Sequence, residues 1–227
     1  MNYLSHYYFN HVVCELPATP MFVVGVTLPD LWRRYSTDRR IRWRHVSDVA
    51  CADKPMRQLR AGLLNHVEAD RAFHALPAFA NWQTELKHAF RRDARGELHS
   101  AVLDFLTHVA IELCLDRQLI ERDARHMHAY YDLLAAARDE RFDACVSATV
   151  GVDATGIGEI LDLFIERRFL AAYDNFDALV TIVRRLLSFV RHSIEVDDEQ
   201  IRSILIDANT CVEPAAVWAE MPRLNAE

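Results

Sequence analysis

Histidine and acidic side chains recur at intervals of four residues in two apolar stretches of the chain. GLLNHVEADRAFH contains His66, Asp70 and His74, and LDFLTHVAIE contains Asp104 and His108. Residues four apart lie on the same face of an α-helix, one turn from each other. We therefore expect each stretch to direct imidazole and carboxylate groups towards one side of a helix.

Two such helices, packed together, would bring these groups to one point, as helical proteins do when they build metal sites. Mixed histidine and carboxylate ligands suit Mn²⁺, Mg²⁺, Fe²⁺ or Zn²⁺. A divalent ion held in this way can turn water into a nucleophile near neutral pH and neutralise charge on a phosphate. The spacing therefore predicts a divalent-cation site with hydrolytic potential.

Each of these residues also has a structural interpretation. The chain contains 11 histidines in 227 residues, so pairs of histidine and acid at helical spacing arise by chance. His108 can neutralise Asp104 without a metal, and Glu112, four residues on, is expected at the surface. His74 near the end of its helix can interact with the helix dipole instead. The recurrence of the pattern on two helices favours a shared site.

Three further features lie earlier in the chain. Asp30 in GVTLPDLWRRY follows a proline and is either the N-cap of a helical turn or a ligand at the edge of the core. His6 in the first helix can approach the site if that helix packs beside it. The arginine-rich segment 33–45 is either a solvated surface or a phosphate-binding one, because guanidinium groups match phosphate oxygens. The substrate-binding candidates in it are Arg33, Arg34 and Arg39.

The periodicity of apolar residues is helical almost throughout and predicts an all-α fold in a single domain over residues 1–227, with about eight to ten helices. Glycines concentrated at 151–156 mark a possible sub-boundary. The strongest helix predictions are 55–75, 79–94, 97–121, 157–172 and 174–193, with one or two helices in 123–148 and a last one from about 199 behind Asp197.

Composition narrows the possible classes of protein. The net charge of −7 does not favour nucleic acid as a partner. Five scattered cysteines without paired spacing argue against a disulfide framework or a zinc ribbon. The apolar runs are shorter than the roughly 20 residues that span a bilayer, and the N-terminus does not have the pattern of a signal peptide. We therefore expect a cytoplasmic protein without membrane insertion; the sequence does not indicate its oligomeric state.

Three stretches in this order resemble the acyl carrier protein phosphodiesterase family, which is related to the HD-domain metal phosphohydrolases. They are MNYLSH, GVTLPDLWR and AGLLNHVEAD, which place Asp30, His66 and Asp70 on the family's functional residues. LDFLTHVAIE is similar to a later helix of the family, so the likeness covers about residues 1–120. The chain differs at His74, where the family usually has aspartate, and at Thr107, where the family has the aspartate of an Asp-His doublet.

The resemblance implies an HD-domain-like fold and metal-dependent hydrolysis of a phosphodiester, with Mn²⁺ or Mg²⁺ as cofactor and acyl carrier protein as a possible substrate. We expect Asp30, His66 and Asp70 to act in catalysis. The expected metal ligands are Asp30, His66, Asp70, Asp104 and His108, with His6 and His74 as outer candidates. The alternative is a helical binding or scaffold protein that kept the fold and lost catalysis, as the missing carboxylate at Thr107 suggests.

Overall fold

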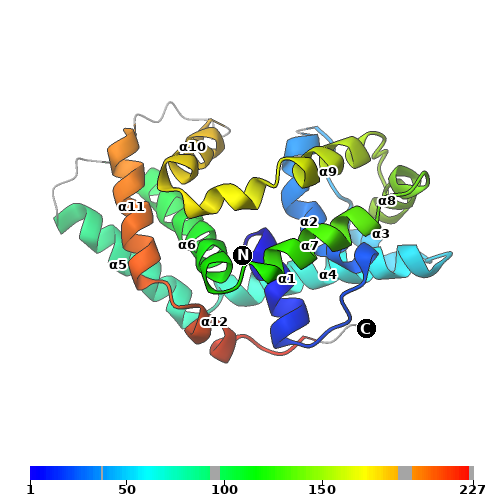
Figure 1. The fold of residues 1–227 in the computed structure, drawn as a ribbon, viewed down its shortest axis with the longest axis horizontal. Coiled ribbons are helices and arrows are strands. Elements are labelled where there is room, and N and C mark those ends of the chain that lie inside the picture. The colour runs from blue at the N-terminus through cyan, green and yellow to red at the C-terminus, as the bar shows by residue number, and fades with distance from the viewer. Residues whose placement is uncertain (37, 93–97, 189–195, 225–227) are drawn as a thin grey trace.

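The computed structural model describes residues 1–36, 38–92, 98–188 and 196–224, and all regular secondary structure in these ranges is helical (Figure 1). In chain order the helices are α1 (Tyr3–Tyr8), the π-helix η1 (Phe9–Val13), α2 (Pro20–Tyr35), α3 (Trp43–Asp48), α4 (Lys54–His74), α5 (Pro77–Arg92), α6 (Ser100–Arg122), α7 (Arg125–Ala136), α8 (Phe142–Val150), α9 (Ile157–Glu166), the 3-10 helix η2 (Phe169–Asp174), α10 (Phe176–Leu187), α11 (Asp198–Cys211) and α12 (Pro214–Glu220).

The all-α prediction is confirmed, whereas the HD-domain-like arrangement stays a prediction. The described helices outnumber the expected eight to ten because short helices such as α3 escape periodicity and because the predicted helix 157–172 divides into α9 and η2. Residues 93–94 and 189–193, at the ends of two predicted helices, lie outside the described ranges. Asp197 caps α11 as expected, since its side chain accepts a hydrogen bond from the backbone of Gln200.

Helices α2 and α4 make the most extensive contact between any two elements. They cross where Gly25 of α2 faces Gly62 of α4, and the two backbones nearly touch. A Cβ atom added to Gly62 would lie 2.2 Å from the carbonyl oxygen of Phe22 and 2.9 Å from the Cα of Gly25. Only glycine permits this approach, which sets the distance between the two helices.

Asp30 lies inside α2, since the helix continues through Pro29 to Tyr35. The expectation that Asp30 acts as an N-cap is therefore wrong. Proline disrupts a helix because it has no N–H group and its ring crowds the preceding turn. Here the tight packing of the segment before Pro29, in which every residue from Met21 to Leu28 is buried, holds the helix together.

Helix α1 lies between α6 on one side and α2 and α7 on the other (Figure 1). Its first turn is fixed by Asp116 of α6, whose two carboxylate oxygens accept hydrogen bonds from the backbone N–H groups of Leu4 (3.0 Å) and Ser5 (2.7 Å). These groups have no partner within the helix. Asp116 thereby determines where the side chain of His6 points.

Replacing Asp116 by alanine is expected to destabilise the protein by about 2–4 kcal/mol, because two buried N–H groups lose their acceptor. The loss is measured as the free energy of unfolding in urea. Asp132→Ala on α7 is the matched control because Asp132 is exposed. Equal stability of the two variants would show that Asp116 does not anchor α1.

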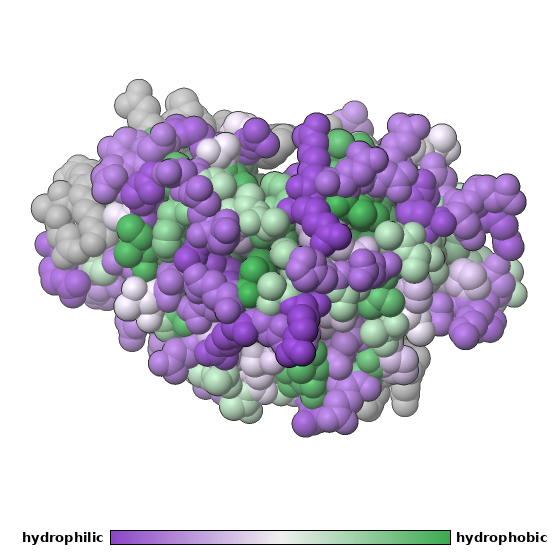
Figure 2. All heavy atoms as spheres, in the orientation of Figure 1, coloured by the Kyte–Doolittle hydropathy of each residue, from purple (hydrophilic) through white to green (hydrophobic). Residues whose placement is uncertain are grey.

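Buried side chains from α1 to the segment after α12 form one continuous core. In the N-terminal helices Leu4 and Tyr7 are buried, but Val12 is 38% exposed. The change from α- to π-helix at Phe9 rotates the face that would have buried Val12. None of the helices in the described ranges has the length and apolar character that a membrane span requires, and Figure 2 shows a face with mainly hydrophilic residues around small apolar areas.

Candidate metal centre

Three helices bring His6 (α1), Asp30 (α2) and His66 (α4) together in the interior. One potential ligand atom from each of these residues lies within 4.8 Å of the other two. The rings of His6 and His66 stack with their centroids 4.0 Å apart. We call these three residues the inner cluster.

The inner cluster contains buried polar atoms without a hydrogen-bond partner among the described residues. They are both ring nitrogens of His6 and Oδ2 of Asp30. Nδ1 of His66 lies 2.8 Å from the carbonyl oxygen of Val26, so a proton on Nδ1 is donated to Val26 and Nε2 keeps its lone pair. Unpartnered polar atoms are costly in a protein interior. Two imidazole nitrogens and a carboxylate oxygen form a donor set that fits a divalent metal ion.

The electrostatics of the inner cluster follow from its burial. Burial lowers the pKa of His66 to about 4, and burial together with repulsion from His66 lowers the pKa of His6 well below its usual range. Burial also raises the pKa of Asp30 to about 7. Both imidazoles are therefore neutral at physiological pH, and neutral imidazole is the form that ligates metals.

A second group, which we call the outer cluster, consists of His74 (α4), His108 (α6) and Glu112 (α6). Nε2 of His74 lies 3.0 Å from Oε1 of Glu112, and Nε2 of His108 lies 3.3 Å from the same oxygen. The two imidazole rings stack with centroids 4.7 Å apart. Their side chains are more accessible than those of the inner cluster, with 28% of His74 and 38% of His108 exposed.

Asp70 and the amino group of Met1 link the two clusters electrostatically: they contact the outer cluster, and their charges influence the pKa values of Asp30 and His66. The Met1 nitrogen donates hydrogen bonds to Oδ1 of Asp70 (2.7 Å) and to Oε1 of Glu112 (2.9 Å). Oδ2 of Asp70 lies 3.3 Å from Nδ1 of His74. Burial opposes ionisation of Asp70, but the hydrogen bond from His74 and the Met1 ammonium hold its pKa well below the usual value. Burial likewise opposes the charge on His74, yet its bonds to Asp70 and Glu112 raise its pKa to about 9.

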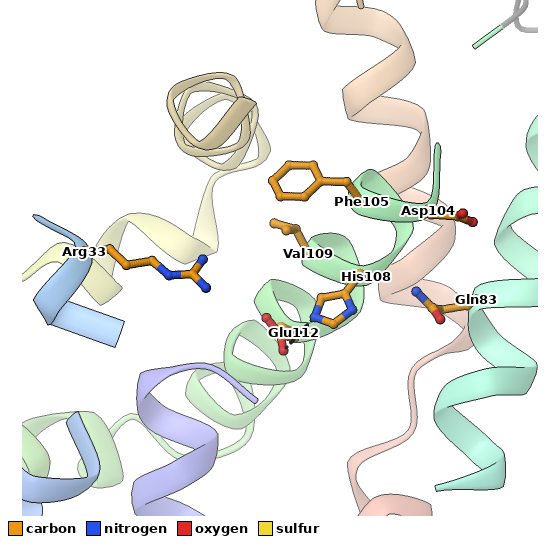
Figure 3. A pocket seen from close by; sticks show the side chains of 7 residues that line it. All are labelled: Arg33, Gln83, Asp104, Phe105, His108, Val109 and Glu112. Atoms are coloured by element: carbon orange, nitrogen blue, oxygen red, sulfur yellow. Dashed lines mark ion pairs between the residues drawn. The ribbon is translucent and has the colours of Figure 1, made fainter. Parts of the chain in front are cut away.

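A pocket of about 420 Å³ opens beside the outer cluster (Figure 3). His108 and Glu112 form part of its wall, and Arg33 of α2 extends its guanidinium group towards them from the opposite side. Phe105 and Val109 of α6 supply apolar surface, and Gln83 and Asp104 lie at the other end. The pocket therefore combines a cation, a potential metal site and an apolar wall.

The structure brings six of the expected metal ligands into the two clusters and the bridge between them, namely His6, Asp30, His66, Asp70, His74 and His108. Asp104 is not among them. Its side chain is 57% exposed and Oδ1 lies 2.5 Å from Nζ of Lys87. The expectation that Asp104 is a ligand thus does not match its position, because at Asp104 the α6 face turns towards α5 and solvent.

The three expected substrate-binding arginines have different surroundings. Arg33 lines the pocket. Arg34 lies over the ring of Phe169, 4.2 Å from its centroid. Arg39 forms an ion pair with Asp153 (2.9 Å) and so contacts the loop before α9. Of the three, only Arg33 faces the pocket beside the clusters.

Sequence reasoning missed two groups that contribute to this centre. Glu112 was expected at the surface, but 82% of its side chain is hidden, since only 18% is exposed. Its spacing of four residues from His108 was the signal that would have found it. The amino group of Met1 has no sequence signature, because its position depends on how α1 packs.

Comparisons with known proteins identify no relative: no protein-family model, no curated protein and no solved structure matches the chain. The resemblance to the acyl carrier protein phosphodiesterase family therefore depends on the motifs in the sequence. What the structure adds is the position of those motifs, because MNYLSH, GVTLPDLWR and AGLLNHVEAD supply His6, Asp30 and His66 of the inner cluster.

Proposed function

We propose that the protein is a metal-dependent hydrolase of phosphate esters and that the inner cluster binds its metal ion. One observation carries the proposal: donor atoms of His6, Asp30 and His66 converge in the interior from three helices, and those of His6 and Asp30 include buried atoms without a hydrogen-bond partner among the described residues. Unpaired buried polar atoms are costly, and a bound cation would give them a partner. A bound divalent ion would supply Lewis acidity to a phosphate oxygen and would lower the pKa of water.

The protein's own residues have separate roles in this proposal. Val26 orients the ring of His66 by accepting the Nδ1 proton, which is the usual way in which a metal-binding histidine is held. Asp30 contributes negative charge, and Asp70 adds a second carboxylate at the edge of the cluster. Arg33 extends into the pocket, where its guanidinium group can bind a phosphate of the substrate.

The pocket bears on the class of substrate. Its volume of about 420 Å³ is in the range of pockets for small organic ligands. A phosphodiester or phosphomonoester can place its phosphate between Arg33 and the clusters and an organic group against Phe105 and Val109. Manganese is the proposed ion, with iron or zinc as alternatives, because the two imidazoles of the inner cluster do not suit magnesium. Acyl carrier protein is a candidate carrier of the phosphodiester because of the sequence resemblance.

Metal analysis together with hydrolysis assays tests this function. We expect the purified protein to bind one Mn²⁺ that depends on His66 and to hydrolyse bis-p-nitrophenyl phosphate or p-nitrophenyl phosphate. His66→Ala is expected to weaken Mn²⁺ binding at least about tenfold and to abolish hydrolysis. Asp132→Ala is the control, since Asp132 is exposed on α7 and belongs to neither the clusters nor the pocket wall, and it should retain both properties.

A folded wild-type protein that binds no Mn²⁺ and hydrolyses neither ester would contradict the proposal. It would favour a helical scaffold that kept the fold without catalysis.

A further inference from the structure

The outer cluster has the geometry of a metal site in its own right. In a tetrahedral zinc site with bonds of 2.0–2.1 Å, the ligand atoms lie about 3.3 Å from one another. Nε2 of His74 and Nε2 of His108 lie 3.0 and 3.3 Å from Oε1 of Glu112. These separations match the edges of such a coordination shell, so only small side-chain movements are needed to accommodate an ion.

The contacts of His74 provide an independent argument. A metal-binding histidine usually donates its second ring N–H to a carboxylate or carbonyl, which fixes the orientation of the ring. Nδ1 of His74 lies 3.3 Å from Oδ2 of Asp70, while Nε2 faces Glu112. Asp70 thus holds His74 with Nε2 directed into the cluster, as a supporting carboxylate would.

Packing fixes both imidazoles before any ion arrives. Phe79 of α5 meets the ring of His74 edge-on with centroids 5.0 Å apart and the ring of His108 with centroids 5.2 Å apart. The two imidazoles also stack on each other. Rings packed against Phe79 and against each other lose little rotational freedom on binding an ion, which favours affinity.

The outer cluster differs from the inner one in charge and access. The negative charges of Asp70 and Glu112 face the amino group of Met1 and the imidazole of His74, and a bound cation would take the place of any proton that His74 shares with them. His108 and Glu112 also line the pocket, and three protein ligands leave a fourth position open towards it. An ion there would be open to exchange with solvent and to a small molecule in the pocket.

We propose that His74, His108 and Glu112 form a second cation site that is loaded independently of the inner cluster and takes zinc or a similar transition metal. Two imidazoles and one carboxylate select Zn²⁺ or Co²⁺ over Mg²⁺, which prefers oxygen ligands and keeps its water. An anionic group of a ligand in the pocket can complete the coordination. The site does not require the inner cluster to be catalytic.

Zinc titration of the chelator-treated full chain by calorimetry tests the proposal. We expect the wild type to bind an equivalent of Zn²⁺ that His108→Ala weakens at least about tenfold and that His66→Ala leaves intact. His88→Ala is the matched control because His88 is exposed on α5, away from both clusters. Excess Mg²⁺ should not displace this equivalent.

Cobalt provides a readout that does not depend on activity or on the inner cluster. Co²⁺ bound in a tetrahedral nitrogen–oxygen site absorbs visible light strongly, and we expect this absorption in the wild type and in His66→Ala. Glu112→Gln should remove the absorption. Because glutamine has nearly the same size as glutamate, this variant tests the site even if His108→Ala fails to fold. Equal zinc binding by the wild type, His108→Ala and Glu112→Gln would overturn the proposal, as would loss of all zinc in His66→Ala.

Discussion

Replacing Asp30 by asparagine is expected to reduce phosphate-ester hydrolysis by about a hundredfold to a thousandfold while leaving the metal-free protein as stable as the wild type or more stable. The side chains have the same shape, so packing inside α2 is preserved. The anionic oxygen, which is the strongest cation ligand in the inner cluster, is lost. Most substitutions of buried residues lower activity and stability together, so this separation of the two effects would identify a functional carboxylate.

The stability part of this prediction depends on pH in a definite direction. Burial raises the pKa of Asp30 to about 7 in the folded protein, above the ordinary value of 3.8. A raised pKa of an acid means that its contribution to stability is complete below pH 3.8 and is lost as the pH rises through 7. Asp30→Asn does not titrate, so its stability relative to the wild type should increase between pH 5 and pH 8.

Thermal unfolding in the presence of a chelator measures the stability of Asp30→Asn relative to the wild type. Steady-state hydrolysis at saturating Mn²⁺ measures the activity of both proteins. Asp132→Asn is the control, because the same chemical change at an exposed side chain outside the pocket wall should alter neither quantity appreciably. Full activity of Asp30→Asn would exclude the carboxylate from the reaction. A strongly destabilised variant whose deficit is the same at pH 5 and pH 8 would assign Asp30 a structural role.

Gly62→Ala is expected to lower the free energy of unfolding by about 3 kcal/mol and to weaken metal binding in the inner cluster. The added Cβ would lie 2.2 Å from the carbonyl oxygen of Phe22, so α2 and α4 must separate. The gain in helix propensity from glycine to alanine, about 1 kcal/mol, offsets only part of the strain. Because Asp30 is on α2 and His66 is on α4, their separation also increases the distance between the two ligands.

Urea unfolding of Gly62→Ala tests the expected loss of stability, and Mn²⁺ titration of the same variant tests the expected loss of metal affinity. Gly158→Ala is the matched control, since the atoms nearest to its added Cβ belong to the guanidinium group of Arg138, which can move. We expect that control to retain its stability and its metal affinity. If Gly62→Ala behaved like Gly158→Ala, the close approach of α2 and α4 would not position the inner cluster.

The sequence by itself determined the helices and the pairs of residues that share a helix face. The predicted helix 55–75 is α4, and within it His66, Asp70 and His74 point towards the same region, because the 3.6-residue repeat is a local property of the backbone. Glu112 follows the same rule relative to His108. Residue types and spacing alone could therefore predict that these helices carry groups able to hold a metal ion.

Only the tertiary structure decided which carboxylates join the centre. Asp104 and Glu112 lie about two turns apart on α6, yet Asp104 pairs with Lys87 at the surface and Glu112 contacts His74 and the Met1 amino group. The neighbours along α6 differ, α5 near Asp104 and α1 near Glu112, and helix periodicity contains no information about neighbours. Asp30 and His6 also reach the site through contacts between distant parts of the sequence. The glycine contact between α2 and α4 positions Asp30. The hydrogen bonds from α1 to Asp116 position His6.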